Sequence, residues 1–200
     1  MTFSIQGIMD AFLAMPMWEL IAVVLGIAYV LLAAKESLWT WLFAFFGTFI
    51  YTILFWEGAL VSSSLLNLYY MGMAVYGFFL WRSGGEEGKE LTVSSWSLQK
   101  NMSMIFSGLL IATILGYLSD TYTDAKFAYL DTFVMVFSVL ATWMLANKVL
   151  ENWLYWIVVD SAAIVLYWQT GYLATIVLFA LYVLLAFYGY IAWSKVKNAG

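Results

Sequence analysis

Long apolar stretches recur along this chain, each of about the length that a helix needs to cross the hydrocarbon core of a bilayer. Between them lie polar segments, of which only the one near residues 83–98 is a sizeable loop. The pattern predicts seven transmembrane helices, at residues 18–34, 37–56, 58–81, 99–118, 128–148, 152–169 and 171–193. The predicted fold class is therefore an all-α membrane protein.

The segments outside these stretches suit the two surfaces of a membrane. Residues 1–17 contain no Lys or Arg, and their SIQGIMDAFLAM segment is predicted to lie along the outer interface as a short amphipathic lead-in. The glycines and charges of residues 83–98 indicate a solvated cytoplasmic loop, and residues 195–200 are predicted to form a cytoplasmic tail.

Basic residues divide unevenly between the two sides that a seven-span topology defines. Seven fall on one side, namely Lys35, Arg82, Lys89, Lys100, Lys148, Lys195 and Lys197. Only Lys126 falls on the other side. Because cytoplasmic loops are enriched in Lys and Arg, this division predicts an outer N-terminus and a cytoplasmic C-terminus.

The first three stretches resemble the last three. Glu36, Trp41, Trp56, Gly58, Tyr70, Tyr76, Gly77 and Trp81 recur in order as Glu151, Trp156, Trp168, Gly171, Tyr182, Tyr188, Gly189 and Trp193, with an offset that falls from 115 to 112 residues. Because one more span lies between the copies, both copies enter the membrane in the same sense. Residues 18–82 and 128–194 are therefore predicted to be parallel three-helix repeats, joined by a linker helix and outer loop at residues 99–127.

Repeats of this kind favour a transporter, because repeat-built transporters hold their substrate near the membrane midplane, where the two halves meet. Composition agrees with a membrane protein, since 65% of residues are hydrophobic and only 10% are charged. The chain has no Cys and no His, so it lacks a thiol nucleophile, an imidazole base and the usual ligands of zinc or haem. We expect no metal, no cofactor and no nucleic-acid partner.

Asp160 is a carboxylate placed well inside a predicted span. It lies eight residues beyond Asn152, roughly 12 Å into the membrane at 1.5 Å per residue. Such a group is retained mainly where it faces water or a partner, and no Lys or Arg lies at mid-depth in any predicted span. Asp160 is therefore expected to be protonated, hydrated or paired with a cation that arrives from outside. A protonated Asp bonded to a nearby Ser or Tyr is the alternative.

Two tryptophans share a helix face with this carboxylate. Trp153, Trp156 and Asp160 are spaced i, i+3 and i+7, which places them on one side of a helix. Aromatic rings beside a carboxylate can bind a flat organic cation by stacking and cation–π contact. Trp153 also suits an interfacial anchor, so Trp156, one turn deeper, is the stronger prediction for a ligand platform.

The WxxWxxx(N/D) motif at residues 153–160, the three-plus-one-plus-three plan and the YGxxxW ending of both repeats resemble the PnuC-type vitamin transporters, which have a SWEET-like fold. The likeness extends over about residues 18–193. It implies uptake across the bacterial inner membrane by facilitated diffusion, with trapping by a cytoplasmic kinase, and it implies a homotrimer. Members of the family import nicotinamide riboside or thiamine.

The resemblance also implies roles for individual residues. Trp153 and Trp156 match the family's tryptophan pair, whereas Asp160 stands where nicotinamide-riboside members commonly have Asn. Asn67 takes the position of a family Gln and Tyr188 that of another Asn. Because this leaves fewer amides for a ribose, thiamine is the expected substrate, as in the PnuT branch, and nicotinamide riboside is the alternative.

Further polar residues of the spans are expected to line the substrate cavity. They are Thr48, Tyr51, Asn67 and Tyr70 in the first repeat and Tyr182 in the second. Such side chains also hydrogen-bond between membrane helices, so packing is the alternative role for each.

Two other functional classes remain open. A seven-span receptor would bind its ligand without net flux, although a retinal pigment would need a Schiff-base lysine inside a span, and Lys195 lies at the membrane exit. A membrane enzyme would have Glu19, Asp131 and Asp160 as acids. Glu19 and Asp131 occupy matching outer positions, which favours a shared structural role, so the chain is not expected to be an enzyme.

Overall fold

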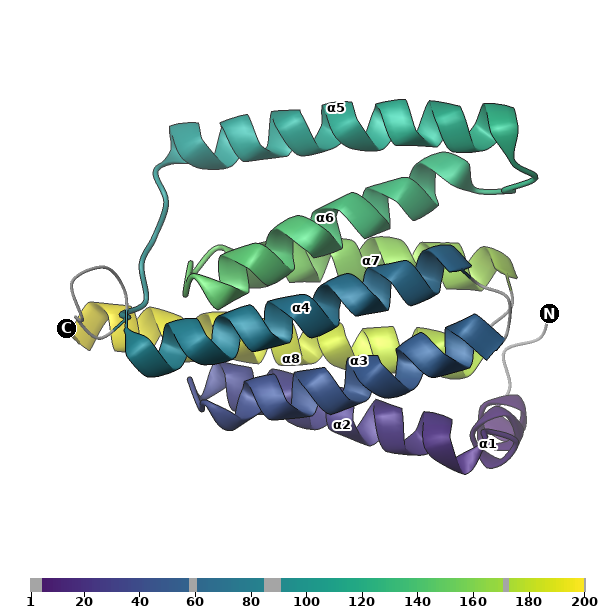
Figure 1. Ribbon diagram of the computed structural model, residues 1–200, viewed down its shortest axis with the longest axis horizontal. Helices are drawn as coiled ribbons and strands as arrows, with labels where there is room; N and C mark the ends of the chain where they lie inside the picture. Colours follow the sequence, from purple (N-terminus) through teal and green to yellow (C-terminus); the bar gives the residue numbers. More distant parts are fainter. Residues whose placement is uncertain (1–4, 58–60, 85–90, 171–172, 200) are drawn as a thin grey trace.

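The protein is mainly helical in the residues that the computed structural model describes, which are 5–57, 61–84, 91–170 and 173–199. The helices of these residues are α1 (Ile5–Leu13), α2 (Met17–Ala34), α3 (Trp39–Glu57), α4 (Val61–Ser83), α5 (Leu98–Tyr122), α6 (Ala128–Ala146), α7 (Asn152–Thr170) and α8 (Leu173–Ala199). Helices α2 to α8 are long, and Figure 1 shows them lying side by side with α1 as a short addition at one end. The predicted all-α class is confirmed.

Helix boundaries follow the apolar stretches closely, and the largest differences lie at two helix ends. Helix α5 continues to Tyr122 and α8 to Ala199, several residues beyond the apolar stretches that predicted them. The extra turns are polar, and Lys197 in the last turn of α8 is favourable beside the negative end of the helix dipole. Residues 58–60 and 171–172, where two spans were expected to begin, and 85–90 of the expected loop lie outside the described residues.

Five of the long helices are long and apolar enough to cross a membrane by length and composition, namely α2, α3, α5, α6 and α8. Helices α4 and α7 have comparable lengths, 23 and 19 residues, but lower hydropathy. The cause is their polar content, which includes Asn67 and Tyr70 in α4 and Asp160 in α7. Five helices thus meet the seven-span prediction by this measure, and the other two carry Asn67, Tyr70 and Asp160 among the predicted site residues.

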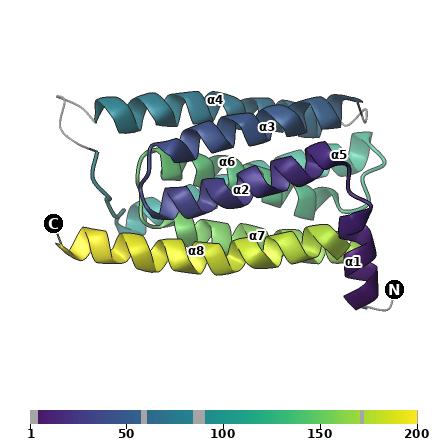
Figure 2. The ribbon, with the colours of Figure 1, turned by 90° about the horizontal axis from the view of Figure 1, so that it is seen from below.

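Six of the long helices form a closed ring, and α5 lies outside it (Figure 1). Around the ring, α2 packs on α3, α3 on α4, α4 on α6, α6 on α7, α7 on α8 and α8 on α2. Helix α5 packs on α6. Helix α1 lies crosswise to the ring, against α8, which suits the predicted interfacial segment (Figure 2).

The two ends of the ring differ in charge. One end, called the basic end here, carries the α2–α3 and α6–α7 connections and the C-terminus, on the left of Figure 1. The basic residues at this end are Lys35, Arg82, Lys100, Lys148, Lys195 and Lys197. Lys126, before α6, lies at the opposite end, and Lys89 is outside the described residues. The charges therefore divide between the ends as the sequence predicted.

The ring has two halves, α2–α3–α4 and α6–α7–α8. In each half, a tryptophan packs against a glycine of the neighbouring helix. A Cβ on Gly77 would lie 2.4 Å from the Trp41 ring, and one on Gly189 would lie 2.6 Å from the Trp153 ring. Only glycine permits either approach. Trp41 also meets Trp81 edge to face at 5.2 Å, and Trp153 meets Trp193 in the same way at 5.4 Å.

These contacts correct the register predicted for the repeat. Trp41 corresponds to Trp153, 112 positions later, and not to Trp156, because Trp41 and Trp153 make the same glycine and tryptophan contacts. The expected three-residue shortening is therefore wrong. The shortening would have to fall between Trp41 and Trp56, within α3, but α3 and its counterpart α7 both have 19 residues.

Candidate functional site

A cavity of about 330 Å³ lies inside the helix ring, and all six ring helices contribute to its wall. Its polar lining residues are Tyr29, Asn67, Tyr70, Asp131, Ser138, Asp160, Tyr167 and Tyr182, with Trp153 and Trp156 beside them. The rest of the lining is apolar or aromatic, as in most small-molecule sites. The cavity therefore combines flat apolar walls with a limited set of hydrogen-bonding groups.

Helix α7 supplies the predicted aromatic and acidic residues from one face. Trp153, Trp156 and Asp160 all line the cavity, so the predicted shared face is confirmed. Trp153 is only 2% exposed, because one ring face lies on Gly189 and its edge meets Trp193. Trp156 is half-buried and borders the open space more freely. Of the two, Trp156 is the ring on which a ligand can stack.

Asp160 is buried, with 3% of its surface exposed, yet it faces the cavity. It lies close enough to Tyr29, Tyr70 and Tyr182 for electrostatic interaction with each of them. Tyr70 and Ser138 both line the same cavity, from α4 and α6. Asp160 is thus surrounded by phenols, and no basic residue of the described chain lines its cavity.

A second carboxylate lines the same cavity. Asp131 lies in the first turn of α6, toward the end of the ring opposite the basic end. With Asp160 it gives the described lining two acidic groups and no Lys or Arg. A cavity of this composition attracts a cation and repels an anion, because the low-dielectric walls screen charge poorly.

A smaller cavity of about 180 Å³ adjoins the first, mostly against α2 and α3. Four aromatic residues, Tyr29, Tyr70, Trp156 and Tyr182, line both spaces. Thr48 and Tyr51, expected in the main cavity, line this smaller one instead. The Thr48 hydroxyl donates its hydrogen bond to the backbone oxygen of Ala44, in the same helix, at 2.8 Å.

The structure does not place Tyr188 with the other predicted site residues. Tyr188 borders neither cavity, and 46% of its surface is exposed. The reason is helical rotation, since the next residue, Gly189, faces Trp153. Adjacent helix positions point about 100° apart, so Tyr188 is turned away from the ring interior.

Sequence reasoning missed several lining residues. Tyr29 lies in an apolar stretch with no motif around it, so nothing in the sequence singled it out. Asp131 and Ser138 are seven residues apart, which places them on one face of α6. Reading that face for polar residues would have found both. Among the described residues, no cluster of three acidic, His or Cys side chains is placed to hold a metal.

Comparison with known proteins finds relatives that are all named as transporters. The family model for the nicotinamide mononucleotide transporter matches residues 16–195. The nicotinamide riboside transporter PnuC of Escherichia coli is 23% identical over 179 residues, covering 76% of this chain and 74% of its own. PnuC of Haemophilus influenzae is 26% identical over 195 residues, covering 93% and 80%. The riboflavin/roseoflavin transporter RibM of Streptomyces davaonensis is 23% identical over 180 residues, covering 88% and 83%.

A solved structure supports the same fold. The crystal structure of the vitamin B3 transporter PnuC superimposes with a TM-score of 0.73 at 21% sequence identity, covering 91% of this chain and 82% of that one. The apolar helices, the cavity inside their ring and a family match over nine-tenths of the sequence agree with one another. The chain belongs to the nicotinamide mononucleotide transporter family of multi-pass membrane proteins.

Proposed function

We propose that this protein carries nicotinamide riboside through the membrane, with the cavity inside the helix ring as its binding site. The observation that supports this most is the composition of the cavity, where Trp156 and Asp160 lie together and no basic residue lines the described wall. Nicotinamide riboside is a flat pyridinium cation on an uncharged sugar. Its ring suits the tryptophan face and its charge suits the carboxylates.

The charge of the lining also bears on the phosphorylated form of the substrate. Nicotinamide mononucleotide carries a phosphate, which needs Arg, Lys or a free helix N-terminus to replace its hydration. Two carboxylates and no Lys or Arg line the described cavity, so a phosphate there would be repelled. The proposed substrate is therefore the nucleoside rather than the nucleotide for which the family is described.

The ribose has hydroxyl groups to satisfy, and the cavity offers partners for them. Asn67 and Tyr70 line it from α4, and Tyr182 lines it from α8. A ribose held in the cavity by a pyridinium ring on Trp156 could hydrogen-bond to these amide and hydroxyl groups. Tyr182 borders both cavities, so a substrate longer than one ring can extend past it into the smaller space.

Thiamine is the second candidate substrate. It is also a flat cation, and Asp160 in place of the Asn found in nicotinamide-riboside members favours a ligand that makes a stronger charge contact. Two considerations support nicotinamide riboside ahead of it. Several relatives are named as nicotinamide riboside transporters, and the lining carries amide and hydroxyl groups with which a ribose could hydrogen-bond.

The proposed architecture consists of seven spans in two parallel three-helix repeats, residues 18–82 and 128–194. Helix adjacency supports it, because α2–α3–α4 and α6–α7–α8 are each packed in chain order and meet through two matching contacts, α4 with α6 and α8 with α2. The equivalent tryptophan and glycine contacts, 112 positions apart, support it too. The segments at 1–17, 83–98, 99–127 and 195–200 would then be the lead-in, the cytoplasmic loop, the linker with its outer loop, and the tail.

We propose further that transport is facilitated diffusion into the cell. A carboxylate that pairs with a cationic substrate needs no coupling ion, and phosphorylation inside the cell would retain the product. The basic end of the ring would face the cytoplasm of a bacterial inner membrane, following the distribution of Lys and Arg. All of the relatives reported above are named as transporters, in keeping with a carrier and not an enzyme. The homotrimer stays a prediction.

A ligand panel on purified protein tests the substrate. Nicotinamide riboside, thiamine, riboflavin and nicotinamide mononucleotide are titrated by calorimetry, and the winner is then assayed for net uptake into proteoliposomes. We expect nicotinamide riboside to bind most tightly and the mononucleotide at least tenfold more weakly. Tighter binding of thiamine would favour the second candidate, preference for riboflavin would contradict the cation argument, and binding without uptake would favour a receptor.

One pair of variants tests the site within the same panel. Trp156→Ala is expected to weaken binding by about 1–3 kcal/mol, the scale of one lost stacking or cation–π contact. Trp56→Ala is the matched control, since Trp56 is 65% exposed and lines neither cavity. Equal losses in both variants would point to a general packing role and remove the basis for the site.

A further inference from the structure

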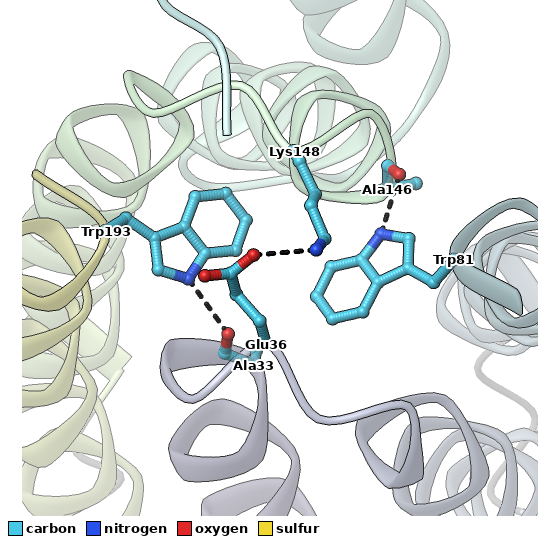
Figure 3. Close-up of polar contacts among 6 residues, drawn as sticks. All are labelled: Ala33, Glu36, Trp81, Ala146, Lys148 and Trp193. Carbon is cyan, nitrogen blue, oxygen red and sulfur yellow. Dashed lines mark hydrogen bonds and ion pairs between the residues drawn. The ribbon is translucent and has the colours of Figure 1, made fainter. Parts of the chain in front are cut away.

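The two connections at the basic end of the ring touch through an ion pair. Glu36 follows α2 and Lys148 follows α6, so the two residues come from opposite halves. The Lys148 Nζ lies 2.6 Å from the Glu36 Oε2 (Figure 3). The Glu36 side chain is only 20% exposed, and the Lys148 side chain is only 10% exposed. This sheltered ion pair joins the α2–α3 connection of one half to the α6–α7 connection of the other.

Two tryptophan side chains flank the ion pair and add bonds across the same boundary. The Trp81 Nε1 donates to the backbone oxygen of Ala146 at 2.9 Å, and the Trp193 Nε1 donates to that of Ala33 at 3.0 Å (Figure 3). Each bond joins one half of the ring to the other. The Lys148 Nζ also lies 4.9 Å from the centre of the Trp81 ring, within cation–π range.

The backbone holds both charged residues in an uncommon conformation. Glu36 has φ 53° and Lys148 has φ 49°. Both values lie in the left-handed region, which is unfavourable for residues other than glycine. The two residues are 112 positions apart, so they occupy matching places in the two halves. The shared conformation turns the two side chains toward each other at the boundary.

This cluster lies directly beneath the cavity. Ala33 and Leu145 line the cavity from the last turns of α2 and α6, and Trp153 lines it from the first turn of α7. Trp153 meets Trp193 edge to face at 5.4 Å, and Trp193 bonds Ala33. The Glu36–Lys148 pair is the next layer outward. A substrate in the cavity is therefore separated from the basic end by these residues.

We propose that Glu36, Lys148, Trp81 and Trp193 form the gate through which the substrate leaves at the basic end. In the present structure the gate is closed. Opening it separates Glu36 from Lys148 and breaks both indole hydrogen bonds, so the halves part at this end. A substrate that displaces Trp153 acts on Trp193 directly, which links the occupied site to the gate. This proposal rests on the transport function above and not on the identity of the substrate.

An ion pair suits a gate for a physical reason. A sheltered pair gains little net free energy over its hydrated charges, because desolvation offsets most of the attraction. Water that enters on opening hydrates both Glu36 and Lys148, so the open and closed states stay close in free energy. An apolar seal of equal area would favour the closed state more strongly. Removing one partner alone leaves a sheltered charge unpaired and destabilises closure.

A reversible crosslink tests the gate without background, because the chain contains no cysteine. Glu36→Cys and Lys148→Cys are combined and joined by a short bifunctional thiosulfonate reagent that a reductant removes. Binding of radiolabelled nicotinamide riboside is measured in detergent, and net uptake is measured in proteoliposomes. We expect the crosslinked protein to bind but not to transport, and we expect the reductant to restore transport. Each single-cysteine variant with the same reagent is the control.

Charge exchange is the second arm, and it has a readout independent of any substrate. Ser138→Cys places a thiol in the cavity wall, and its labelling by a membrane-impermeant maleimide from the basic side reports opening. Glu36→Lys and Lys148→Glu are each expected to raise the labelling rate at least fivefold, and the exchanged pair to restore the slow rate. Failure of nicotinamide riboside to bind would contradict the substrate proposal and leave this readout intact.

The two arms give outcomes that overturn the gate. Unimpaired transport by the crosslinked protein would contradict the gate, because the two halves would then not need to separate at Glu36 and Lys148. Equal labelling rates in the wild type, the single exchanges and the double exchange would do so as well. If the crosslink also abolished binding, the labelling rates alone would decide between a gate and a purely structural ion pair.

Discussion

At the scale of single residues, the protein places a carboxylate where its surroundings supply phenols and indoles but no cation. Asp160 faces the cavity among Tyr29, Tyr70 and Tyr182, and the described lining contains no Lys or Arg. A carboxylate in that setting is costly unless something compensates for its charge. The proposed cationic substrate would supply that compensation, and Asp160 would then determine affinity more than folding.

The variant Asp160→Asn separates charge from hydrogen bonding. The amide keeps the size of the side chain and its ability to accept a hydrogen bond but removes the charge. Wild-type protein is expected to bind nicotinamide riboside more tightly than its reduced dihydropyridine analogue, which has nearly the same shape and no ring charge. In Asp160→Asn this preference should shrink by about tenfold, or 1.4 kcal/mol. Calorimetric titration of both ligands against both proteins measures it.

An unchanged preference would mean that the Asp160 carboxylate does not pair with the ligand's charge. Thermal unfolding of both proteins serves as the control, because a purely structural Asp would shift the melting temperature and leave the ligand preference alone. A similar melting temperature with a reduced preference is the expected combination.

At the scale of elements, close helix contacts decide how the site is held. Trp153 lies flat on Gly189 of α8, and this contact fixes the first turn of α7, from which Trp156 and Asp160 follow. A second contact secures the other side of that turn. Glu151, just before α7, accepts hydrogen bonds from the Ser95 hydroxyl and the Trp96 backbone N–H ahead of α5. The end of the 83–98 loop is thus attached to the helix that carries the site.

Substitution at two glycines tests how tightly α7 is held. In Gly189→Ala the new Cβ would lie 2.6 Å from the Trp153 ring, so the ring must shift into the cavity. We expect a loss of about 1–3 kcal/mol in stability, as for other overpacked cores, together with weaker substrate binding. Gly72→Ala is the matched control in a helix, because no atom lies within 4 Å of its new Cβ. Thermal unfolding and ligand titration of both variants provide the comparison.

The control carries its own expectation. Alanine favours a helix over glycine by up to about 1 kcal/mol, so Gly72→Ala should be neutral or slightly stabilising. If Gly189→Ala behaved like Gly72→Ala in both measurements, the Trp153 contact would not be what positions α7.

At the scale of the whole molecule, the ring and its two ends define a path. The cavity lies within the ring, and the Glu36–Lys148 cluster separates it from the basic end. At the opposite end the ring carries the start of α2 and the crosswise helix α1 (Figure 2). The proposed direction of uptake, toward the basic end, therefore depends on which side of the membrane that end faces.

Cysteine labelling of the otherwise cysteine-free chain gives the orientation. Single replacements Asp124→Cys, before α6, and Asn198→Cys, near the end of α8, are probed in intact cells with a membrane-impermeant maleimide. Asp124→Cys should react from outside, and Asn198→Cys only after the membrane is permeabilised, because the basic end is expected inside. Reaction of both from the same side would contradict the seven-span topology and the proposed parallel repeats.

Much of the fold was predictable because it depends on local patterns. Apolar stretches of bilayer length specify helices wherever they occur, since a backbone in lipid must bond to itself. The spacing of Trp153, Trp156 and Asp160 specified their shared face, because that spacing is a property of one helix alone. Half of the repeat's register was also readable, from Gly77 and Trp81 against Gly189 and Trp193.

What the sequence by itself determined, then, is the helical membrane protein, the uneven charge of its ends and the acidic, aromatic face of α7. Only the tertiary structure decided that Tyr188 faces away, that Thr48 and Tyr51 line a separate cavity, and that Glu36 pairs with Lys148. The physical reason is that these outcomes depend on the rotation of each helix about its axis and on which helices close the ring. Both are set by contacts such as tryptophan on glycine between residues far apart in the chain, and no periodicity within one helix records them.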